Sequence, residues 1–479
     1  MGWARGLLRS GSRRWVRLVT DYDTLRRRHL AHAMAQLPGQ VARLDWPVEQ
    51  IGAERELRLR RLLTLAKQRS SWHRDRLGGL DVDTVGAGQL GEVPPMTKDD
   101  LLAHFDGIVT DPRLSLRGVE AHLEALTADG YLLEEHHAIA SGGSSGRRGV
   151  YVYDWQGWAT YFLSIARRHA HDRREDPALA AAPAVEAIVA ADKPTHGSSA
   201  QGRTFSNPQV RIERIPITLP IAQVVARLNA LAPTTLRGYP SALDQLGLEA
   251  CAGRLQIAPL RVRCVGEPLL PEVRDRLQRA WGVPVHSQWI ASEAGCLGYS
   301  CLRGRGLHLN DDLVIVEAVD ADGQPVPAGT RSTKIYITNL FNDVLPLIRF
   351  EVTDQVTVTA GVCPCGCAHT WIEDIQGRLD DSLRYPGGLT VHPIVLRSPL
   401  GRQPGIAEYQ VHQTPCGVRV LLRLVGEVDL GTLRAELANE LAAGGLVDPD
   451  VVLTPVDHLD RHASGKLPRF VPLRPRDDA

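Results

Sequence analysis

Helical spacing of apolar residues marks the N-terminal part of the chain. One face of a predicted helix carries Leu59, Leu62, Leu63 and Ala66, and arginines fill the opposite face. We therefore expect the first 75 residues to be mainly helical, with the basic face in solvent. Two prolines precede Thr97 and two acidic residues follow shortly after it, which predicts the start of another helix at this point.

Short apolar runs replace the helical pattern after a glycine- and serine-rich stretch at 141–149. Residues 150–153 alternate valine and tyrosine, which predicts a strand. Residues 156–260 alternate helical stretches with short apolar runs, as α/β units do. Further strands are predicted at 313–319, 333–339 and 355–359, so we expect a β-rich module near 300–375.

A new succession of predicted strands and a helix begins in the last hundred residues. Residues 408–412 and 418–425 predict a hairpin, a helix is expected at about 430–443, and a strand at 451–456. This succession predicts a compact βαβ-type lobe, and the boundary before it lies near residue 379.

The chain of 479 residues is too long for one hydrophobic core, so a large N-terminal unit over 1–378 and a small C-terminal unit over 379–479 are expected, both α/β. Hydrophobic residues make up 43% and charged residues 23%, which excludes a disordered chain and a collagen-like repeat. Basic and acidic residues number 55 each, so no global field favours nucleic acid or membranes.

No apolar run approaches the roughly 18 residues that a membrane-spanning helix needs. The first 15 residues contain four arginines and lack the apolar core of a signal peptide. We therefore expect a cytoplasmic protein that binds neither a membrane nor nucleic acid.

The glycine- and serine-rich stretch is the first candidate for chemistry. It consists of Ser141, Gly142, Gly143, Ser144, Ser145, Gly146 and Arg147, followed by a second arginine. Glycines let backbone N–H groups converge on an anion, and hydroxyls and arginine add donors for phosphate oxygens. The stretch is not a Walker loop, because Gly-Lys-Ser/Thr is missing. On its own residues a flexible surface loop is an equally good interpretation.

Several short motifs follow this stretch in a fixed order. They are Val265-Gly266-Glu267-Pro268, Trp289-Ile290-Ala291-Ser292-Glu293-Ala294-Gly295, Thr338-Asn339-Leu340, Pro346-Leu347-Ile348-Arg349-Phe350 through Asp354, Gly377-Arg378-Leu379-Asp380-Asp381 and Ser464-Gly465-Lys466. The ordered set resembles the adenylate-forming superfamily, and within it the phenylacetate–CoA ligase family. The resemblance extends from about Glu54 to Phe470.

The resemblance implies a fold and a role for each motif. The fold is a large N-terminal adenylation domain with several subdomains and a small mobile α/β C-terminal domain. Phosphates would be held by Ser141–Arg147, Ser292 would touch phosphate, and Glu293 would hold Mg²⁺. The nucleotide would also meet Gly266, Glu267, Pro268, Trp289 (where the family has a stacking tyrosine), Asp354 and Arg378. Asp380 would be the hinge and Lys466 the catalytic lysine, and only five of the chain's basic residues are lysines.

The implied enzyme is an AMP-forming acid–thiol ligase that uses ATP, Mg²⁺ and coenzyme A. It activates a small carboxylic acid, by family resemblance an aryl or arylacetic acid, and passes the acyl group to coenzyme A. The motifs do not separate this acceptor from a carrier-protein thiol or an amine, and they leave a homodimer open. An alternative of another class is an inactive binding protein that keeps the fold, held together by zinc.

Cysteines in the β-rich region suggest a metal site. Cys363 and Cys365 lie in a dense run with Cys367, and Cys301 lies upstream with His308. Three thiolates and one imidazole suit the tetrahedral preference of zinc in a closed structural site. Some members of the resembling family hold zinc through this pattern. Reduced thiols without a metal are the alternative, and the roles of Cys367 and His369 stay open.

Overall fold

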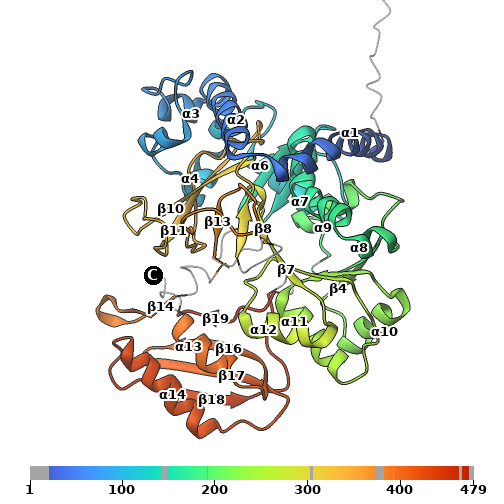
Figure 1. The fold of residues 1–479 in the computed structure, drawn as a ribbon. Coiled ribbons are helices and arrows are strands. Elements are labelled where there is room, and N and C mark those ends of the chain that lie inside the picture. The colour runs from blue at the N-terminus through green and yellow to red at the C-terminus, as the bar shows by residue number, and fades with distance from the viewer. Residues whose placement is uncertain are drawn as a thin grey trace, which may run out of the picture.

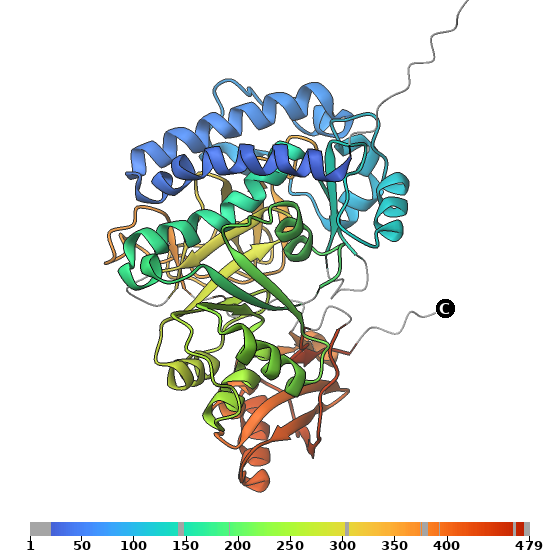
Figure 2. The same ribbon diagram turned by 90° about the vertical axis from the view of Figure 1, so that its right-hand side faces the viewer.

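The computed structural model describes residues 21–141, 148–190, 192–301, 306–373, 375, 382–391, 393–462 and 466–473. Figure 1 shows helices of the N-terminal segment at the top, strands and helices of the main sheet in the middle and the C-terminal lobe below. The quarter turn in Figure 2 keeps the same order from top to bottom.

The N-terminal helices cover one side of the molecule. They are α1 (Tyr22–Ala42), α2 (Val48–Arg69), α3 (Ser71–Arg76), α4 (Lys98–Ala103), α5 (Phe105–Ile108) and α6 (Leu116–Ala125). The predicted apolar face of α2 is fully buried. The predicted helix start at Thr97 is also confirmed, because its hydroxyl accepts a hydrogen bond from the Asp100 N–H at 3.1 Å and Asp100 accepts one from the Thr97 N–H at 2.8 Å.

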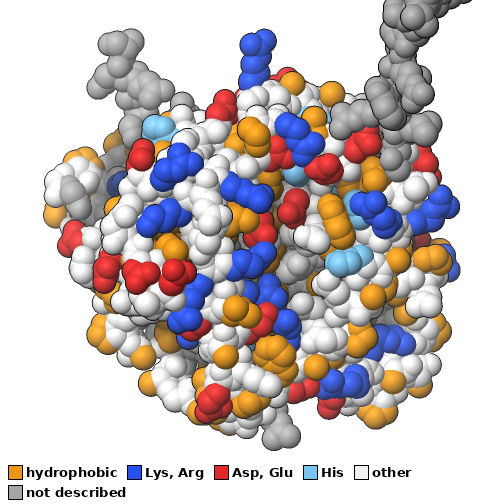
Figure 3. All heavy atoms as spheres, turned by 90° about the horizontal axis from the view of Figure 1, so that it is seen from above, with side chains coloured by type: hydrophobic (Ala, Val, Ile, Leu, Met, Phe, Trp, Pro, Cys, Tyr) orange, Lys and Arg blue, Asp and Glu red, His pale blue; other side chains and the backbone are white. Residues whose placement is uncertain are grey.

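The basic face of α2 lies at the surface, as predicted. Figure 3 shows Lys and Arg side chains across this end of the molecule with Asp and Glu among them. Arg58 pairs with Glu54 at 2.6 Å, and Arg61 pairs with Asp343 at 2.6 Å. The arginines are therefore partly neutralised. The pair of Arg61, which is 51% exposed, carries little stability, whereas Arg58 and Glu54 are each only 18% exposed.

The main sheet has eight strands in the order β13-β9-β8-β7-β6-β5-β3-β4. The bounds are β3 Val185–Ala190, β4 Arg211–Pro216, β5 Thr235–Gly238, β6 Arg261–Val265, β7 Val285–Ala291, β8 Gly295–Ser300, β9 Leu307–Leu309 and β13 Trp371–Ile372. Pairing from β4 to β7 is parallel, and pairing from β7 to β13 is antiparallel. The parallel part confirms the α/β units predicted for residues 156–260.

Helices connect and flank these strands (Figure 1). They are α7 (Trp155–Glu175), α8 (Pro177–Ala181), α9 (Gly197–Thr204), α10 (Ile221–Leu231), α11 (Pro240–Cys251) and α12 (Pro271–Trp281). Short 3-10 helices span Arg43–Asp45, Ala87–Glu92 and Pro386–Gly388. The hairpin of β1 (His136–Ala140) and β2 (Val150–Asp154) flanks the glycine- and serine-rich stretch, and β2 is the strand predicted there.

Strands between residues 300 and 375 divide between two sheets. β9 and β13 extend the main sheet, whereas β10 (Val314–Val319), β11 (Lys334–Asn339) and β12 (Phe350–Val352) form a separate one. The predicted strand at 355–359 is wrong. Thr357 and Val358 make only isolated bridges, to Arg331 and Ile372, so the alternating residues there belong to a bridged loop.

The C-terminal lobe has the predicted hairpin, helix and strand. Its sheet has the order β18-β17-β16-β19, with β16 Ile406–Thr414, β17 Gly417–Leu424, β18 Asp450–Pro455 and β19 Phe470–Val471. The other elements are β14 (Leu383–Arg384), β15 (Thr390–Val391), α13 (Ile394–Gly401) and α14 (Leu430–Ala443). Residues from Leu383 to Phe470 share one apolar core. The predicted boundary near 379 falls in 376–381, outside the described residues.

Across the described ranges, we find no helix with both the length and the apolar character needed to cross a lipid bilayer.

A buried ion pair joins α7 to the segment after β9. The Arg167 guanidinium and the Asp312 carboxylate are both 0% exposed and make two contacts, at 2.7 and 2.8 Å. Asn310 accepts a further hydrogen bond from Arg167, at 2.5 Å. Because both charges are withdrawn from water, Arg167 depends on Asp312 for its counter-charge, while Asp312 also lies 3.6 Å from Arg43. Arg167 holds the pKa of Asp312 well below its usual range against the effect of burial.

Replacement of Asp312 by alanine is predicted to destabilise the protein by about 3–5 kcal/mol, because it leaves a buried guanidinium without its counter-charge. The same replacement at Asp343, whose partner Arg61 is 51% exposed, is the matched control and is expected to cost no more than about 1 kcal/mol. Urea denaturation of the two variants measures the difference, and equal losses would contradict the assignment.

Candidate active site

The candidate site lies where parallel strands end. Val189, Gly238, Cys264 and Ser287 form one row across β3, β5, β6 and β7. Residues just beyond this row therefore emerge from one edge of the sheet, where α/β proteins bind ligands. That edge carries the segment 192–196, Tyr239, Gly266 and the end of β7.

Trp289 and Asp354, predicted as nucleotide-binding residues from separate motifs, are in contact. The Trp289 Nε1–H donates a hydrogen bond to Asp354 Oδ2 at 2.7 Å. Both side chains are largely buried, with residue exposures of 8% and 5%. The indole therefore fixes one carboxylate oxygen of Asp354, since a buried charge-assisted hydrogen bond strongly favours one geometry.

Ser292 and Glu293 lie in the turn between β7 and β8 and contact strand β2. The Tyr151 hydroxyl donates to Glu293 Oε1 at 2.7 Å, and the Tyr153 hydroxyl donates to the Ser292 carbonyl at 2.6 Å. Asn339 donates to the Glu293 carbonyl at 2.9 Å, so a third predicted motif meets the same turn. These contacts fix the turn while Glu293 keeps a second carboxylate oxygen that can accept a ligand.

The glycine- and serine-rich stretch is closed at its base. Ser141 and Gly149 exchange two hydrogen bonds: Ser141 N–H to the Gly149 carbonyl at 2.9 Å, and Gly149 N–H to the Ser141 hydroxyl at 2.8 Å. Six of the seven residues of the predicted phosphate stretch, Gly142 to Arg147, lie outside the described part of the chain, as do Arg378 and Asp380.

Lys466 comes from the C-terminal lobe and lies against the end of β6. A Cβ atom placed on Gly266 would meet the Lys466 Cε at 3.4 Å and the Tyr239 ring at 3.0 Å. Gly266 also has φ +77°, a conformation that glycine adopts without strain. The Lys466 ammonium lies 5.7 Å from the centre of the Tyr239 ring. Glycine at this position thus adopts the positive φ and leaves room for the Tyr239 ring, with the Lys466 side chain in contact beside it.

Glu267 joins the two parts of the chain. Its carboxylate accepts hydrogen bonds from the Ser241 N–H at 3.1 Å, from the Ser241 hydroxyl at 3.1 Å and from the Leu467 N–H at 3.0 Å. The residue next to Lys466 is therefore bound directly to the predicted Gly-Glu-Pro motif, and Pro268 follows in the connection to α12.

His196 is a site residue that the sequence analysis missed. It directly precedes α9, and burial lowers the pKa of its imidazole to about 4, with Lys466, Arg148 and Lys193 as further causes. Arg148 also donates to the Thr195 hydroxyl at 3.3 Å, which connects the loop after β3 to the base of the phosphate stretch. The imidazole is neutral at pH 7 among three cations. The only signal in the sequence was Lys193, one of the rare lysines.

His136 and His137 lie on β1, just before the glycine- and serine-rich stretch. Both are buried on β1, where His136 pairs with Asp111 at 3.0 Å and His137 stacks on Trp158 at 5.0 Å between ring centres. Asp111 is only partly buried and Trp158 belongs to the core, and neither is among the predicted site residues.

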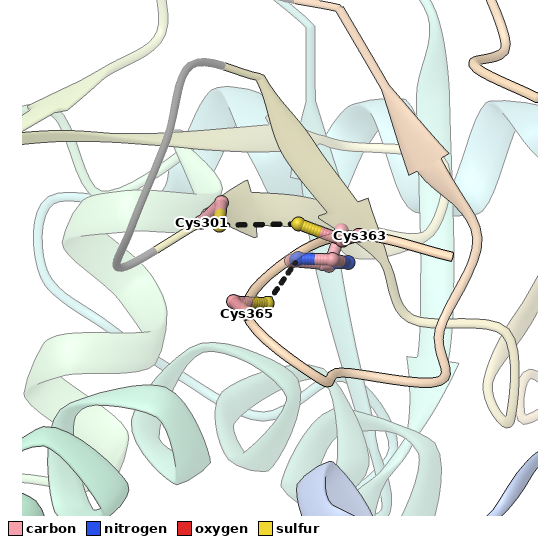
Figure 4. Close-up of side chains that lie close together, drawn as sticks. Cys301, Cys363 and Cys365 are labelled. Atoms are coloured by element: carbon pink, nitrogen blue, oxygen red, sulfur yellow. Dashed lines mark hydrogen bonds between the residues drawn. The ribbon is translucent and has the colours of Figure 1, made fainter. Parts of the chain in front are cut away.

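Four soft ligands converge beside the main sheet, as predicted. One ligand atom from each of Cys301, His308, Cys363 and Cys365 lies within 4.8 Å of all the others. Figure 4 shows the Cys301 and Cys363 thiols pointing toward each other, and their sulfurs are 3.5 Å apart. Cys365 Sγ lies 3.2 Å from His308 Nε2. The group could hold a metal ion.

The surroundings of this group suit a metal ligand set. The other His308 nitrogen, Nδ1, lies 3.2 Å from the His369 carbonyl, which fixes Nε2 as the atom that faces the thiols. The Cys367 N–H donates to Cys365 Sγ at 3.4 Å. Burial raises the pKa of the Cys363 thiol to about 12. Four groups that can share one cation thus converge, and the neighbouring Cys365 and Cys301 thiols add to the effect of burial on the Cys363 pKa.

Cys367 and His369 have other surroundings. Cys367 Sγ lies 3.7 Å from the Tyr299 hydroxyl. His369 Nδ1 lies 3.7 Å from Asp311, and its Nε2 lies 3.3 Å from the Arg43 carbonyl. Within the ranges that the structure describes, neither residue joins the four-ligand group.

No family model matches the chain. The phenylacetate-coenzyme A ligase of Thermus thermophilus is 26% identical to it over 472 residues, which cover 89% of this chain and 98% of that ligase. The match therefore includes both the main sheet and the C-terminal lobe.

Solved structures of 2-hydroxyisobutyryl-CoA ligase share the fold. The complex with 2-HIB-AMP in the postadenylation state matches with a TM-score of 0.69 and 20% identity, over 91% of this chain and 92% of that chain. The complex with 2-HIB-AMP and CoA in the thioesterification state matches with a TM-score of 0.56, over 90% and 91%. These comparisons confirm the resemblance to adenylate-forming CoA ligases and the predicted α/β fold.

Proposed function

We propose that the chain is an AMP-forming carboxylate–CoA ligase, which joins a carboxylic acid to ATP as an acyl-adenylate and then transfers the acyl group to coenzyme A. The observation that carries this proposal is the position of Lys466. A lysine from the small lobe reaches the edge of the sheet beside Gly266 and Tyr239, next to the motif residues that resemble nucleotide ligands. Similarity to a phenylacetate-coenzyme A ligase over most of both chains supports it.

Attack of a carboxylate on the α-phosphate of ATP brings two negative groups together. Lys466 would offset the negative charge that builds up between them, and this role is electrostatic rather than acid–base. Glu293 provides the hard oxygen that suits Mg²⁺, which supplies further positive charge when bound. Tyr151 would hold Glu293 in position through its hydroxyl.

Asp354 would bind the ribose. A carboxylate can accept from two hydroxyls at once, and the hydrogen bond from Trp289 orients the Asp354 carboxylate. Ser141 to Arg147 would bind phosphates, with Ser292 at their edge, and Arg378 would assist. The Gly266-Glu267-Pro268 segment would flank the base, while the Glu267 carboxylate accepts hydrogen bonds from Ser241 and Leu467.

Two half-reactions with different nucleophiles require two arrangements around one acyl group. Rotation of the C-terminal lobe at Asp380 would supply them. We further propose an aryl or arylacetic acid as substrate, by similarity to the phenylacetate-coenzyme A ligase. Coenzyme A is preferred over a carrier protein as acceptor on the same ground.

We also propose that Cys301, His308, Cys363 and Cys365 hold one structural Zn²⁺. Three thiolates and an imidazole are a closed tetrahedral set with no position left for substrate. The ion would tie the loop that bears Cys363 and Cys365 to the ends of β8 and β9. Its contribution would therefore be to stability rather than to the reaction.

Purified protein given ATP, Mg²⁺, coenzyme A and phenylacetate is expected to yield AMP, pyrophosphate and an acyl-CoA, which mass spectrometry identifies. A panel of aryl, arylacetic and short aliphatic acids then defines the acid pocket. Turnover only with a phosphopantetheinylated carrier would show that the acceptor is a carrier protein and not coenzyme A. The absence of pyrophosphate release with every acid would refute the proposed function.

Substitution of Lys466 by alanine is predicted to lower acyl-adenylate formation about 100- to 1000-fold, because it removes a charge directed at the transition state. Conversion of pre-made acyl-adenylate to acyl-CoA should change far less. The control is Lys67→Ala, in the N-terminal helix α2, where the ammonium donates to the Leu80 carbonyl at 3.0 Å. Pyrophosphate release by the Lys466 variant at the wild-type rate is incompatible with the assigned role.

Metal analysis is predicted to find about one zinc per chain. The double variant Cys363→Ser, Cys365→Ser should lose the metal and melt at a lower temperature, while adenylation at low temperature persists. The double variant Cys251→Ser, Cys416→Ser, in which two exposed cysteines are changed, is the matched control. Metal-free wild-type protein, with melting unchanged by the first substitution, would rule out the zinc site.

A further inference from the structure

We infer that Arg461 is a positioning residue for adenylation: it fixes the loop that carries Lys466 against the main sheet. The inference rests on the proposed function, because it assigns Arg461 to one half-reaction and not to the other. Arg461 and Leu467, on either side of Lys466 in the sequence, both bind the main sheet domain.

Described residues on both sides of positions 463–465 contact each other and the main sheet domain. The His462 N–H donates to the Lys466 carbonyl at 3.0 Å, which closes a loop. At one end, Arg461 Nη1 donates to the Ser241 hydroxyl at 3.0 Å. At the other end, the Leu467 N–H donates to Glu267 at 3.0 Å. Since Ser241 is itself bound to Glu267, both attachments lead to one small cluster at the start of α11.

Arg461 is held from its own lobe as well. Its Nη2 donates to Glu408 on β16, a carboxylate that is 2% exposed. Arg423 of β17 donates to the same carboxylate at 3.0 Å, and Gln245 of α11 donates to it at 2.5 Å. The Arg461 guanidinium thus bridges a buried carboxylate of the lobe and a buried hydroxyl of the main sheet domain.

These contacts differ in what happens to them when the lobe moves. The bonds from Arg461 and Arg423 to Glu408 lie within the lobe and can persist through a rotation. The bonds from Arg461 to Ser241, from Leu467 to Glu267 and from Gln245 to Glu408 cross between the lobe and the sheet domain and must break. Arg461 therefore stabilises only the arrangement in which Lys466 lies beside Gly266.

A hydrogen bond from a charged donor to a buried acceptor contributes enough that its loss should change an equilibrium about ten- to a hundredfold. Arg461→Ala removes the donor and leaves Glu408 paired with Arg423, so the lobe keeps its internal ion pair. Arg461→Lys keeps the charge but loses the planar fork that contacts two acceptors at once, and should restore part of the effect.

The first test measures the position of the loop and needs no catalytic activity. Hydrogen exchange of the amides of His462 and Leu467 is expected to be about tenfold faster in Arg461→Ala than in wild type, whereas amides of β16 and β17 should exchange as before. Ser241→Ala removes the same contact from the other side and should have a similar effect. The control is Arg402→Ala, which removes an arginine paired with Glu436 inside the lobe. Unchanged exchange at Leu467 in both variants would overturn the inference.

The second test separates the half-reactions. Pyrophosphate exchange with ATP and the best acid of the panel should fall at least about tenfold in Arg461→Ala. Conversion of the synthetic acyl-adenylate with coenzyme A should be unchanged or faster, because that step requires the crossing contacts to break. Equal losses in both half-reactions would mean a general structural role. Wild-type protein without pyrophosphate exchange would refute the proposed function, while the exchange of the Leu467 amide would still decide whether Arg461 holds the loop.

Discussion

Parallel pairing of β3, β5, β6 and β7 is the constraint on which the candidate site depends. Parallel strands in register end at one edge, so the segments that follow them emerge side by side. Tyr239, Gly266 and the turn after β7 are brought together in this way, although the chain between the first and last of them runs through two helices. A slip of one residue in this pairing would turn each side chain to the opposite face.

Close approach at this edge depends on small residues. Gly238 leaves room for the Val189 carbonyl, which would lie 2.6 Å from a Cβ atom there. Gly266 has a positive φ and accepts the Lys466 side chain beside it. Gly238 therefore permits close approach of the neighbouring strand, and Gly266 leaves room for the Tyr239 ring beside Lys466.

The spacing of apolar residues and the turn residues predicted most of the helices and strands. The hairpin, helix and strand of the lobe follow from apolar spacing and turn residues, and the convergence of Cys301, His308, Cys363 and Cys365 follows from ligand type and spacing. The strand expected at 355–359 failed because alternation of side chains does not guarantee a partner strand along its whole length.

Contacts between motifs could not be predicted in the same way. The Trp289 indole meets Asp354 across 65 positions of sequence, and the Leu467 amide meets Glu267 across 200. The family resemblance implied that Trp289, Asp354 and Glu267 belong to a site but not which residue each one touches, because that depends on strand order and on how the lobe packs. His196 and Arg461 escaped notice for this reason: each belongs to a cluster only through residues far away in the chain.

The C-terminal lobe is held together by apolar packing inside it, but it contacts the sheet domain through hydrogen bonds. Inside the lobe, Leu, Val, Tyr and Phe side chains form one apolar core, so the lobe holds together by itself. Across to the sheet domain, Gln245 meets Glu408, Arg461 meets Ser241 and Leu467 meets Glu267. Separating an apolar interface costs free energy in proportion to the apolar area that becomes exposed to water. Polar groups that separate can form hydrogen bonds with water in place of those they lose, so the net cost is small. Hydrogen bonds across this interface can therefore fix one orientation of Lys466 without making that orientation permanent, as the two proposed half-reactions would require.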